Sequence, residues 1–433
     1  MKYVKLLLTS VFFLSSLGLW SYDFSVNGKY YNITNRETNE VEITNNGNST
    51  SMNSTYTEDL EIPKAVTRLN VTYKVTGIGA KAFRYCTKLT SVTMPNTVKY
   101  IGEAAFEYCT GLLSVSFSDS LESVGTNAFD ECQSLESVVL PESVTTMGNS
   151  VFWSCSSLTS VKLPSRLKAI ESRTFSSCRA LKTIVIPDSV TEIKEWAFSN
   201  CSNLSSVKFP DSLRVIGRNS FWTCRSLKSV EIPKGVTSIG LRAFGNTKKL
   251  SSINVDSENE KYKSLDGVLY NKYVTELIQY PANMPELWYK IPASVKRLSS
   301  KAFYDCQNLE TLIIPESIQS VDTFAIAECA NLKYIFCLNE EPLSFSVEPF
   351  SGDYISDCTL FVPENSIEAY QQAEYWKEFK QVLALDDPLA VSDVKEDENE
   401  SPYVYTLDGR RVLLSDIKEN CIYIKDGKKY IMR

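Results

Sequence analysis

The sequence predicts a mainly β solenoid, in which short units stack and share one interior. Three observations support this prediction. Seven cysteines from Cys86 to Cys224 stand 23 residues apart, a phenylalanine three residues before each cysteine keeps the same period, and most units carry a proline after a short alternating segment. Units of this size cannot bury an apolar face alone, so successive units must stack on one another.

The unit has the frame L-x-x-V-x-h-P-x-x-h-x-x-h-G-x-x-h-F-x-x-C, where h is apolar, as in Leu135–Cys155. Val92 and Met94 alternate with Ser91 and Thr93, which predicts a short strand with one face inward. Proline ends the strand. Equivalent strands of neighbouring units are expected to pair as a parallel sheet, about 4.8 Å apart.

A glycine such as Gly102 follows the second apolar stretch of most units and marks a bend, although Glu171 and Lys194 replace it in two units. We therefore expect a bend that favours positive φ without requiring it. The phenylalanines run from Phe83 to Phe244 and resume at Phe303. Their rings are predicted to stack as a spine on the side opposite the strands.

The cysteine ladder resumes at Cys306 after an irregular unit of 59 residues, in which Thr247 takes the cysteine place. Stacked equivalent side chains point in parallel, which disfavours bridges between them. Buried filler is the preferred interpretation of the ladder thiols, and disulfide or redox chemistry is the alternative in an oxidising compartment. Cys337 and Cys358 lie off the ladder and are the best candidates for a disulfide.

Composition argues against several functions. The balance of 45 basic and 52 acidic residues, a net charge of −7, disfavours nucleic acid as a partner. The absence of histidine removes the usual general base and the commonest zinc ligand. The dinucleotide-like stretch GIGAKA, Gly77–Ala82, only fills bend and spine positions of the first unit and lacks a βαβ context. No catalytic residue, cofactor or metal ligand is predicted, and the chain is not expected to be an enzyme.

The signature I-G-x-x-A-F-x-x-C-x-x-L-x-x-V-x-L-P recurs over about Ile62 to Leu338. It resembles the BspA-type leucine-rich repeat family of secreted bacterial surface proteins. The resemblance implies a curved β-solenoid whose short parallel strands line a concave face. It also implies a binding role, since the better-known members are adhesins for host matrix proteins or other bacteria, although many members have no known ligand.

The N-terminal part predicts export and a cap. Lys2 and Lys5 precede a short apolar run, which is typical of a secretory signal peptide cleaved near Ser21; a retained anchor is the alternative. Residues 22–77 alternate like strands, with a hairpin turn at Asn27–Gly28, and would cover the first repeat.

The C-terminal part predicts an insertion, a second cap and a small final unit. Ser264–Pro281 suggests a hairpin that projects from the solenoid, and a strand ending at Pro363 is followed by a helix. Asp386–Pro402 is acidic and reads as a linker. The last 30 residues resemble the end of sorting domains that direct proteins through a Gram-negative outer-membrane secretion system, with a pair of finishing hairpins as the alternative. The predicted units are the signal peptide 1–21, N-terminal β cap 22–77, leucine-rich-repeat solenoid 78–338 with its irregular unit at about 247–302, C-terminal cap 339–385, linker 386–402 and sorting-like segment 403–433.

The candidate binding surface follows from the strands. Residues between the inward apolar positions would form an exposed, shallow strip, although its charges could equally serve solubility. Trp153 and Trp222 follow spine phenylalanines and are expected on the outer turn, where packing is favoured over ligand contact. We expect an exported, monomeric surface protein of a Gram-negative bacterium that binds a protein or glycan ligand; a passive spacer of the cell envelope is the alternative. The predicted binding residues are Ser137, Val139, Ser160, Lys162, Thr183, Val185, Ser206, Lys208, Ser229 and Glu231.

Overall fold

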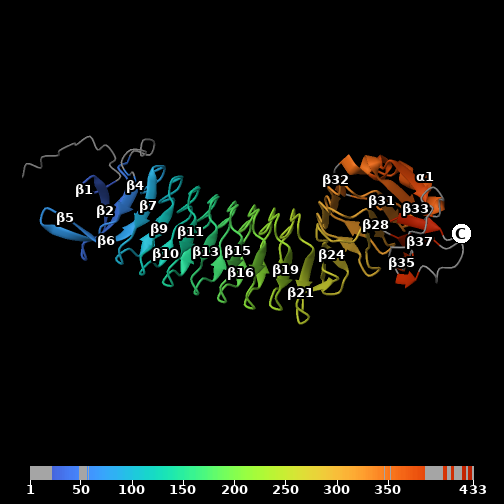
Figure 1. The fold of residues 1–433 in the computed structure, drawn as a ribbon, viewed down its shortest axis with the longest axis horizontal. Coiled ribbons are helices and arrows are strands. Elements are labelled where there is room, and N and C mark those ends of the chain that lie inside the picture. The colour runs from blue at the N-terminus through green and yellow to red at the C-terminus, as the bar shows by residue number, and fades with distance from the viewer. Residues whose placement is uncertain are drawn as a thin grey trace, which may run out of the picture.

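The structure, a computed structural model, is an elongated stack of coils with a cap at each end (Figure 1). It is a mainly β solenoid, so the predicted fold class is confirmed. Within the described residues no helix is long and apolar enough to cross a membrane. The described residues are 22–47, 56, 58–345, 347–351 and 353–385, with the strands 403–406, 411–413, 422–425 and 428–431.

Each regular coil contains two short strands and an outer turn. In one coil β11 (Ser137–Val139) is followed by β12 (Thr146–Met147) and then by the turn that carries the spine phenylalanine and the cysteine. The first strand pairs in parallel with β13 (Ser160–Lys162) of the next coil, in a register that joins Ser137 to Ser160. The pairing register therefore equals the 23-residue sequence repeat.

The strands form two rows along the stack. The first strand row contains β4 (Glu58–Glu61), β7 (Leu89–Thr93), β9 (Ser114–Ser116), β11, β13, β15 (Thr183–Val185), β17 (Ser206–Lys208), β19 (Ser229–Ile232) and β21 (Ser252–Val255). The second strand row contains β6 (Val71–Ile78), β8 (Tyr100–Ile101), β10 (Ser123–Val124), β12, β14 (Ala169–Ile170), β16 (Glu192–Ile193), β18 (Val215–Ile216) and β20 (Ser238–Ile239). Neither row is one unbroken sheet, because hydrogen bonding lapses between some neighbours.

The phenylalanine spine is confirmed. Neighbouring rings from Phe83 to Phe244 are stacked, with centroids 5.1 Å apart for the first pair and 5.6 Å apart for the last. These phenylalanines are almost completely buried. Stacking of identical rings at the coil spacing adds a directional contact to the area that each ring buries.

The ladder cysteines are buried, and none of them forms a disulfide with a residue that the structure describes. Most of them do more than fill space, because the thiol donates to the backbone carbonyl of the spine phenylalanine in the preceding coil. The distance from Cys201 Sγ to Phe175 O is 3.0 Å, and that from Cys109 Sγ to Phe83 O is 3.1 Å. Each such carbonyl lies in the interior and gains a second donor from the neighbouring layer.

The bend glycine corrects our expectation about backbone conformation. Among the described glycines, only Gly28, Gly47 and Gly267 have positive φ, so the bend position does not. A Cβ atom at Gly102 would lie 2.6 Å from the backbone nitrogen of Ala80 in the preceding coil. Close approach of the coils, not a left-handed turn, is the reason for glycine here.

Positive φ occurs instead at two non-glycine residues of the outer turn. In the second coil these are Ala104 and Tyr108, with φ of 52° and 60°. Equivalent residues recur around each spine phenylalanine, and the backbone N–H groups of the turn bond to the next coil, as from Phe83 N to Ala105 O at 2.7 Å. Hydrogen bonding between stacked coils thus holds these residues at positive φ, which non-glycine residues usually avoid.

Two neighbouring coils carry side chains at the bend. Glu171 and Lys194 form an ion pair there, with 2.6 Å between Oε2 and Nζ. The second strand row is interrupted just before these coils, between β12 and β14. A side chain at the bend does not by itself prevent pairing, because β14 and β16 still pair although Lys194 occupies the bend of the later coil.

The insertion is built into the stack and does not project from it, contrary to prediction. It forms β22 (Tyr262–Leu265), β23 (Val268–Asn271) and β24 (Glu276–Gln279), of which β22 and β23 make an antiparallel hairpin. Val268, Leu269 and Tyr270 are fully buried. Leu269 packs into the core on one side, and its two neighbours pack into the core on the other side. The hairpin therefore divides the solenoid into a first segment, which ends at β21, and a second segment, which begins at β24.

The spine of the second segment begins at Tyr280, which sequence analysis missed. Its ring stacks on Phe303 with centroids 5.1 Å apart. Tyr280 stands 23 residues before Phe303, so the repeat spacing alone could have found it.

The second segment and its cap continue the same coil. A five-stranded parallel sheet joins the first-row strands of this segment, and a short helix α1 (Ile367–Gln372) lies in the chain between the last two of them. The buried side chain of Tyr370 anchors the helix to the core. The strands are β25 (Trp288–Lys290), β26 (Arg297–Leu298), β27 (Phe303–Tyr304), β28 (Thr311–Ile314), β29 (Ser320–Val321), β30 (Ile326–Ala327), β31 (Tyr334–Cys337), β32 (Phe350–Ser351), β33 (Thr359–Val362) and β34 (Gln381–Ala384).

The disulfide predicted between Cys337 and Cys358 is wrong, because both thiols are buried and free. The register of β31 and β33 pairs Tyr334 with Thr359, so the positions of Cys337 and Cys358 are offset by four residues along the strands. That offset is about 13 Å at the usual rise per residue, whereas a disulfide requires Cα atoms within about 7 Å. Cys337 Sγ instead lies 3.3 Å from Tyr370 Oη.

At the N-terminus the predicted hairpin turn is confirmed, with positive φ at Asn27 and Gly28. The cap strand β3 pairs in parallel with β6 and so covers the start of the second strand row. The strands of this cap are β1 (Phe24–Val26), β2 (Lys29–Asn35), β3 (Glu40–Thr44) and β5 (Ala65–Arg68).

The final strands form a four-stranded antiparallel sheet in the order β36-β35-β37-β38. The predicted signal peptide at 1–21 and the linker at 386–402 lie outside the described residues, and the domain boundaries stay predictions. The strands of the sheet are β35 (Tyr403–Thr406), β36 (Arg411–Leu413), β37 (Ile422–Lys425) and β38 (Lys428–Ile431).

Candidate binding surfaces

The predicted binding residues all lie exposed on the first strand row, at alternate positions of five consecutive strands. We call these ten residues the strip. The residues between them point inward, and Val138, Ile184 and Val230 are buried. Outward and inward residues alternate along each strand, and neighbouring strands pair with a 23-residue register. The strip therefore lies on one face.

A groove interrupts the strip. β13 and β15 belong to separate two-stranded sheets, although their coils are neighbours in the stack. A hollow of about 520 Å³ lies between them and is bordered by Ser160, Lys162, Thr183 and Val185 of the strip. Four of the ten predicted residues are thus gathered around one depression. The remaining six lie on either side of it.

The strip combines exposed apolar and charged groups. Val139 is 61% exposed and Val185 is 68% exposed. Lys162 and Lys208 add positive charge, and Lys162 has only a distant carboxylate, Glu142, at 4.0 Å. The face can bury apolar area and pair with acidic groups, and nothing in it is arranged for bond cleavage.

The two tryptophans have different surroundings. Trp153 is 37% exposed on the outer turn. Trp222 packs across the junction, with its ring 5.5 Å from that of Tyr304 and with Lys301 Nζ 5.0 Å from its centre. Packing, as predicted, is the role of Trp222.

A second hollow, the junction cleft, lies where the inserted hairpin separates the segments. Its volume is about 370 Å³, and it was not predicted. One wall is the end of the second strand row in the first segment, and the other comes from β23, β24 and β26. Sequence reasoning had no signal for it, because no motif marks its residues.

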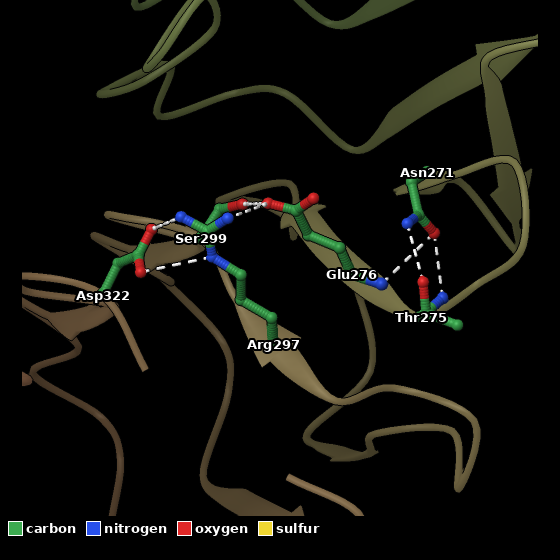
Figure 2. Close-up of polar contacts among 6 residues, drawn as sticks. All are labelled: Asn271, Thr275, Glu276, Arg297, Ser299 and Asp322. Carbon is green, nitrogen blue, oxygen red and sulfur yellow. Dashed lines mark hydrogen bonds and ion pairs between the residues drawn. The ribbon is translucent and has the colours of Figure 1, made fainter. Parts of the chain in front are cut away.

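Charged residues from three strands converge beside this cleft. Figure 2 shows Arg297 between two carboxylates, with its Nη2 2.8 Å from Asp322 Oδ2 and its Nη1 3.7 Å from Glu276 Oε1. Ser299 Oγ donates to Glu276 Oε1 at 2.7 Å. Asn271 Oδ1 accepts the backbone N–H of Thr275 at 2.8 Å and thereby fixes the turn before β24.

The thiols do not provide a nucleophile. Burial raises the pKa of Cys201 to about 12, and it also raises the pKa of other ladder thiols such as Cys109 and Cys224. A thiol with such a pKa is protonated at neutral pH, and the thiolate is the reactive form. The described residues contain no group of three or more acidic, cysteine or histidine side chains placed to hold a metal ion.

Comparison with known families agrees with this geometry. The chain matches the BspA type leucine rich repeat region, in six copies, over residues 47–178, 76–205, 151–265 and 283–373. The chain belongs to this family. BspA-type repeat proteins are typically bacterial surface or secreted proteins, and no enzyme family is indicated.

Solved structures support the same fold. A leucine rich cell surface protein from Faecalibacterium prausnitzii A2-165 is 26% identical with a TM-score of 0.58, and the match covers 83% of this chain and 94% of that one. A leucine-rich repeat protein from Bacteroides ovatus is 23% identical with a TM-score of 0.51, over 83% of this chain and 99% of that one. None of the curated proteins matches the chain.

Proposed function

We propose that this BspA-type protein is an exported, non-catalytic binding protein that holds a protein ligand along the strip. The observation that carries the proposal is the presence of exposed valines on a rigid ladder. Val139 and Val185 face outward while their neighbours seal the core. Exposed apolar groups that lie in a row on one face are a feature of interaction surfaces.

A protein ligand suits this surface better than a glycan. The strip is long and shallow, and a hollow lies in it between β13 and β15. An extended protein surface can cover the valines and place acidic groups beside Lys162 and Lys208.

The test is capture of ligands by the mature chain on an array of extracellular matrix proteins and glycans. The double variant Val185→Ser with Lys162→Glu should lose at least tenfold in affinity for a captured protein. Arg179→Glu, an exposed charge reversal on the outer turn, is the control and should bind normally. If no protein is captured, the chain is a spacer; if only glycans are captured, the choice of ligand class is wrong.

Export rests on the two ends of the chain. Residues 1–21 would direct secretion, and the sheet of β35 to β38 would act as a sorting domain for the outer-membrane route of a Gram-negative bacterium. Deletion of Ser401–Arg433 should abolish surface display without loss of the folded solenoid. Unchanged display after this deletion would leave only a structural role for the final sheet.

A further inference from the structure

The junction cleft exists because the inserted hairpin prevents the usual pairing of strands. In a regular coil, the second strand pairs with its equivalent 23 residues later. β20 has no such partner in the next coil, and its Ile239 N–H is instead accepted by Tyr262 Oη at 2.8 Å. The side chain of Tyr262 therefore spans part of the space that a strand would have filled.

The acidic residues of the cleft are already engaged. Glu276 and Asp322 both contact Arg297, and the contact of Arg297 with Asp322 is bidentate, at 3.3 Å from Nε and 2.8 Å from Nη2 (Figure 2). Two carboxylates and one guanidinium leave this cluster with a net charge of about −1 if considered alone.

Two further cations line the cleft and have no counter-ion. Arg242 comes from the first segment and Lys261 from the start of the hairpin. Neither forms an ion pair with any residue that the structure describes, whereas Arg297 forms two. Arg242 Nε is also enclosed without a hydrogen-bond acceptor. The five charged residues of the lining therefore sum to a net charge of +1, with the uncompensated charges at Arg242 and Lys261.

The charge of Arg242 also acts on a neighbouring lysine. Burial and then the positive charge of Arg242 lower the pKa of Lys301, and Glu328 partly offsets this; Lys301 Nζ lies 4.0 Å from the ring centre of Tyr304. An anion bound beside Arg242 would reduce this repulsion.

We infer that the junction cleft binds a small organic oxyanion, with Arg242 and Lys261 supplying the positive charge that attracts it. A planar guanidinium and an ammonium are the side chains best suited to carboxylate, sulfate or phosphate. The apolar wall of Ile239, Tyr262 and Leu241, the last 42% exposed, would contact the body of the ligand. A cleft of about 370 Å³ has room for a ligand of about one sugar ring.

This site is independent of the proposed protein binding. The strip lies on the first strand row, and the cleft is bordered by the second. Either function can therefore fail without the other.

The experiment uses the mature chain and four probes that share one hexose body: glucose, glucuronate, glucose 6-sulfate and glucose 6-phosphate. Binding is measured by calorimetry at constant ionic strength, with inorganic sulfate and phosphate as further controls. At least one charged hexose should bind saturably, and glucose should bind at least tenfold more weakly. The charged probe that binds best identifies which oxyanion the site prefers.

Two variants test the assigned residues. Lys261→Gln alters an exposed side chain. Arg242→Asn introduces asparagine, a residue type that tolerates the positive φ of 59° at this position. Each should weaken binding of the charged probe about tenfold or more. Lys263→Gln, two residues further along the chain in β22 and outside the cleft lining, should leave binding of the charged probe unchanged.

Three results would overturn the inference. They are the absence of saturable binding of every charged probe up to about 10 mM, equal binding of glucose, and an equal effect of Lys261→Gln and Lys263→Gln. Retention of full affinity by both Lys261→Gln and Arg242→Asn would show that a charged probe binds elsewhere.

Discussion

The two segments of the solenoid use equivalent strand positions in opposite ways. Val185 in the first segment and Phe336 in the second each stand seven residues after a ladder cysteine. Val185 is 68% exposed, whereas Phe336 is 3% exposed. Ile313 and Phe361 share the buried environment of Phe336 and form a small apolar cluster with it on the outward side of their sheet.

This difference shows that the coil geometry does not decide which face is available. The second segment has strands of up to four residues in one five-stranded parallel sheet, and its outward face is covered. The first-row strands of the first segment lie in sheets of two or three strands, and the residues of the strip are exposed on them. The proposed binding surface lies in the first segment, where the outward residues of the strip are exposed, whereas Ile313, Phe336 and Phe361 of the second segment are buried.

The largest expected effect is on the spine that both segments share. Phe198→Ala should lower the free energy of unfolding by about 3–5 kcal/mol, because the ring is fully buried between Phe175 and Phe221. Tyr280→Phe is the matched control at the junction: it keeps the ring and removes a buried hydroxyl that has no partner. Chemical denaturation should show a large loss for the first variant and none for the second. Equal stability of Phe198→Ala and the wild type would show that the spine does not support the stack.

A matched pair of substitutions tests the contrast between the strand faces. Phe336→Lys should lower the free energy of unfolding by about 3 kcal/mol, because it places a charge in a buried apolar cluster. Val185→Lys, at the equivalent exposed position, should change it by less than about 0.5 kcal/mol. Thermal melting of the two variants side by side provides the measurement, and similar melting temperatures would remove the distinction between the segments.

A buried carboxyl on the outer turn of the first segment makes stability depend on pH. Burial, and then Glu107 and Glu131, raise the pKa of Asp130 to about 7, and a hydrogen bond from the backbone of Glu131 and then the charge of Arg84 only partly offset this. The folded state therefore retains a proton that the unfolded chain releases near pH 4. The contribution of this retained proton to the free energy of unfolding is complete below about pH 4 and is lost as pH rises through about 7.

Asp130→Asn should remove that dependence and raise the free energy of unfolding by about 2 kcal/mol at pH 8. Melting temperatures from pH 5 to pH 8 provide the measurement. A variant whose melting temperature falls with pH as steeply as that of the wild type would contradict the assignment to Asp130.

The smallest expected effect is on the thiols. The native chain should react very slowly with iodoacetamide at pH 8, because the described cysteines are buried and burial raises the pKa of Cys201 to about 12. In denaturant without reductant the same thiols should all be alkylated. Mass spectrometry counts the adducts, and several native bridges in either segment would contradict this result.

Much of the fold could be predicted from the sequence, because the repeat period carries the pairing register. The spine, the buried ladder thiols and the exposed strip followed from spacing and alternation alone. The bend glycine was assigned the wrong reason, since contact between the backbones of Gly102 and Ala80 depends on how closely the coils stack. The disulfide failed for a similar reason, because the strand offset between Cys337 and Cys358 is set by register.

The sequence by itself determined that identical units stack, because a 23-residue unit with one apolar face has no other way to bury it. Only the tertiary structure decided where that stacking is interrupted. The inserted hairpin places Val268 and Leu269 in two different cores and leaves Arg242 facing a cleft. Such a site depends on contacts between residues far apart in the chain, and no local pattern of side chains encodes them.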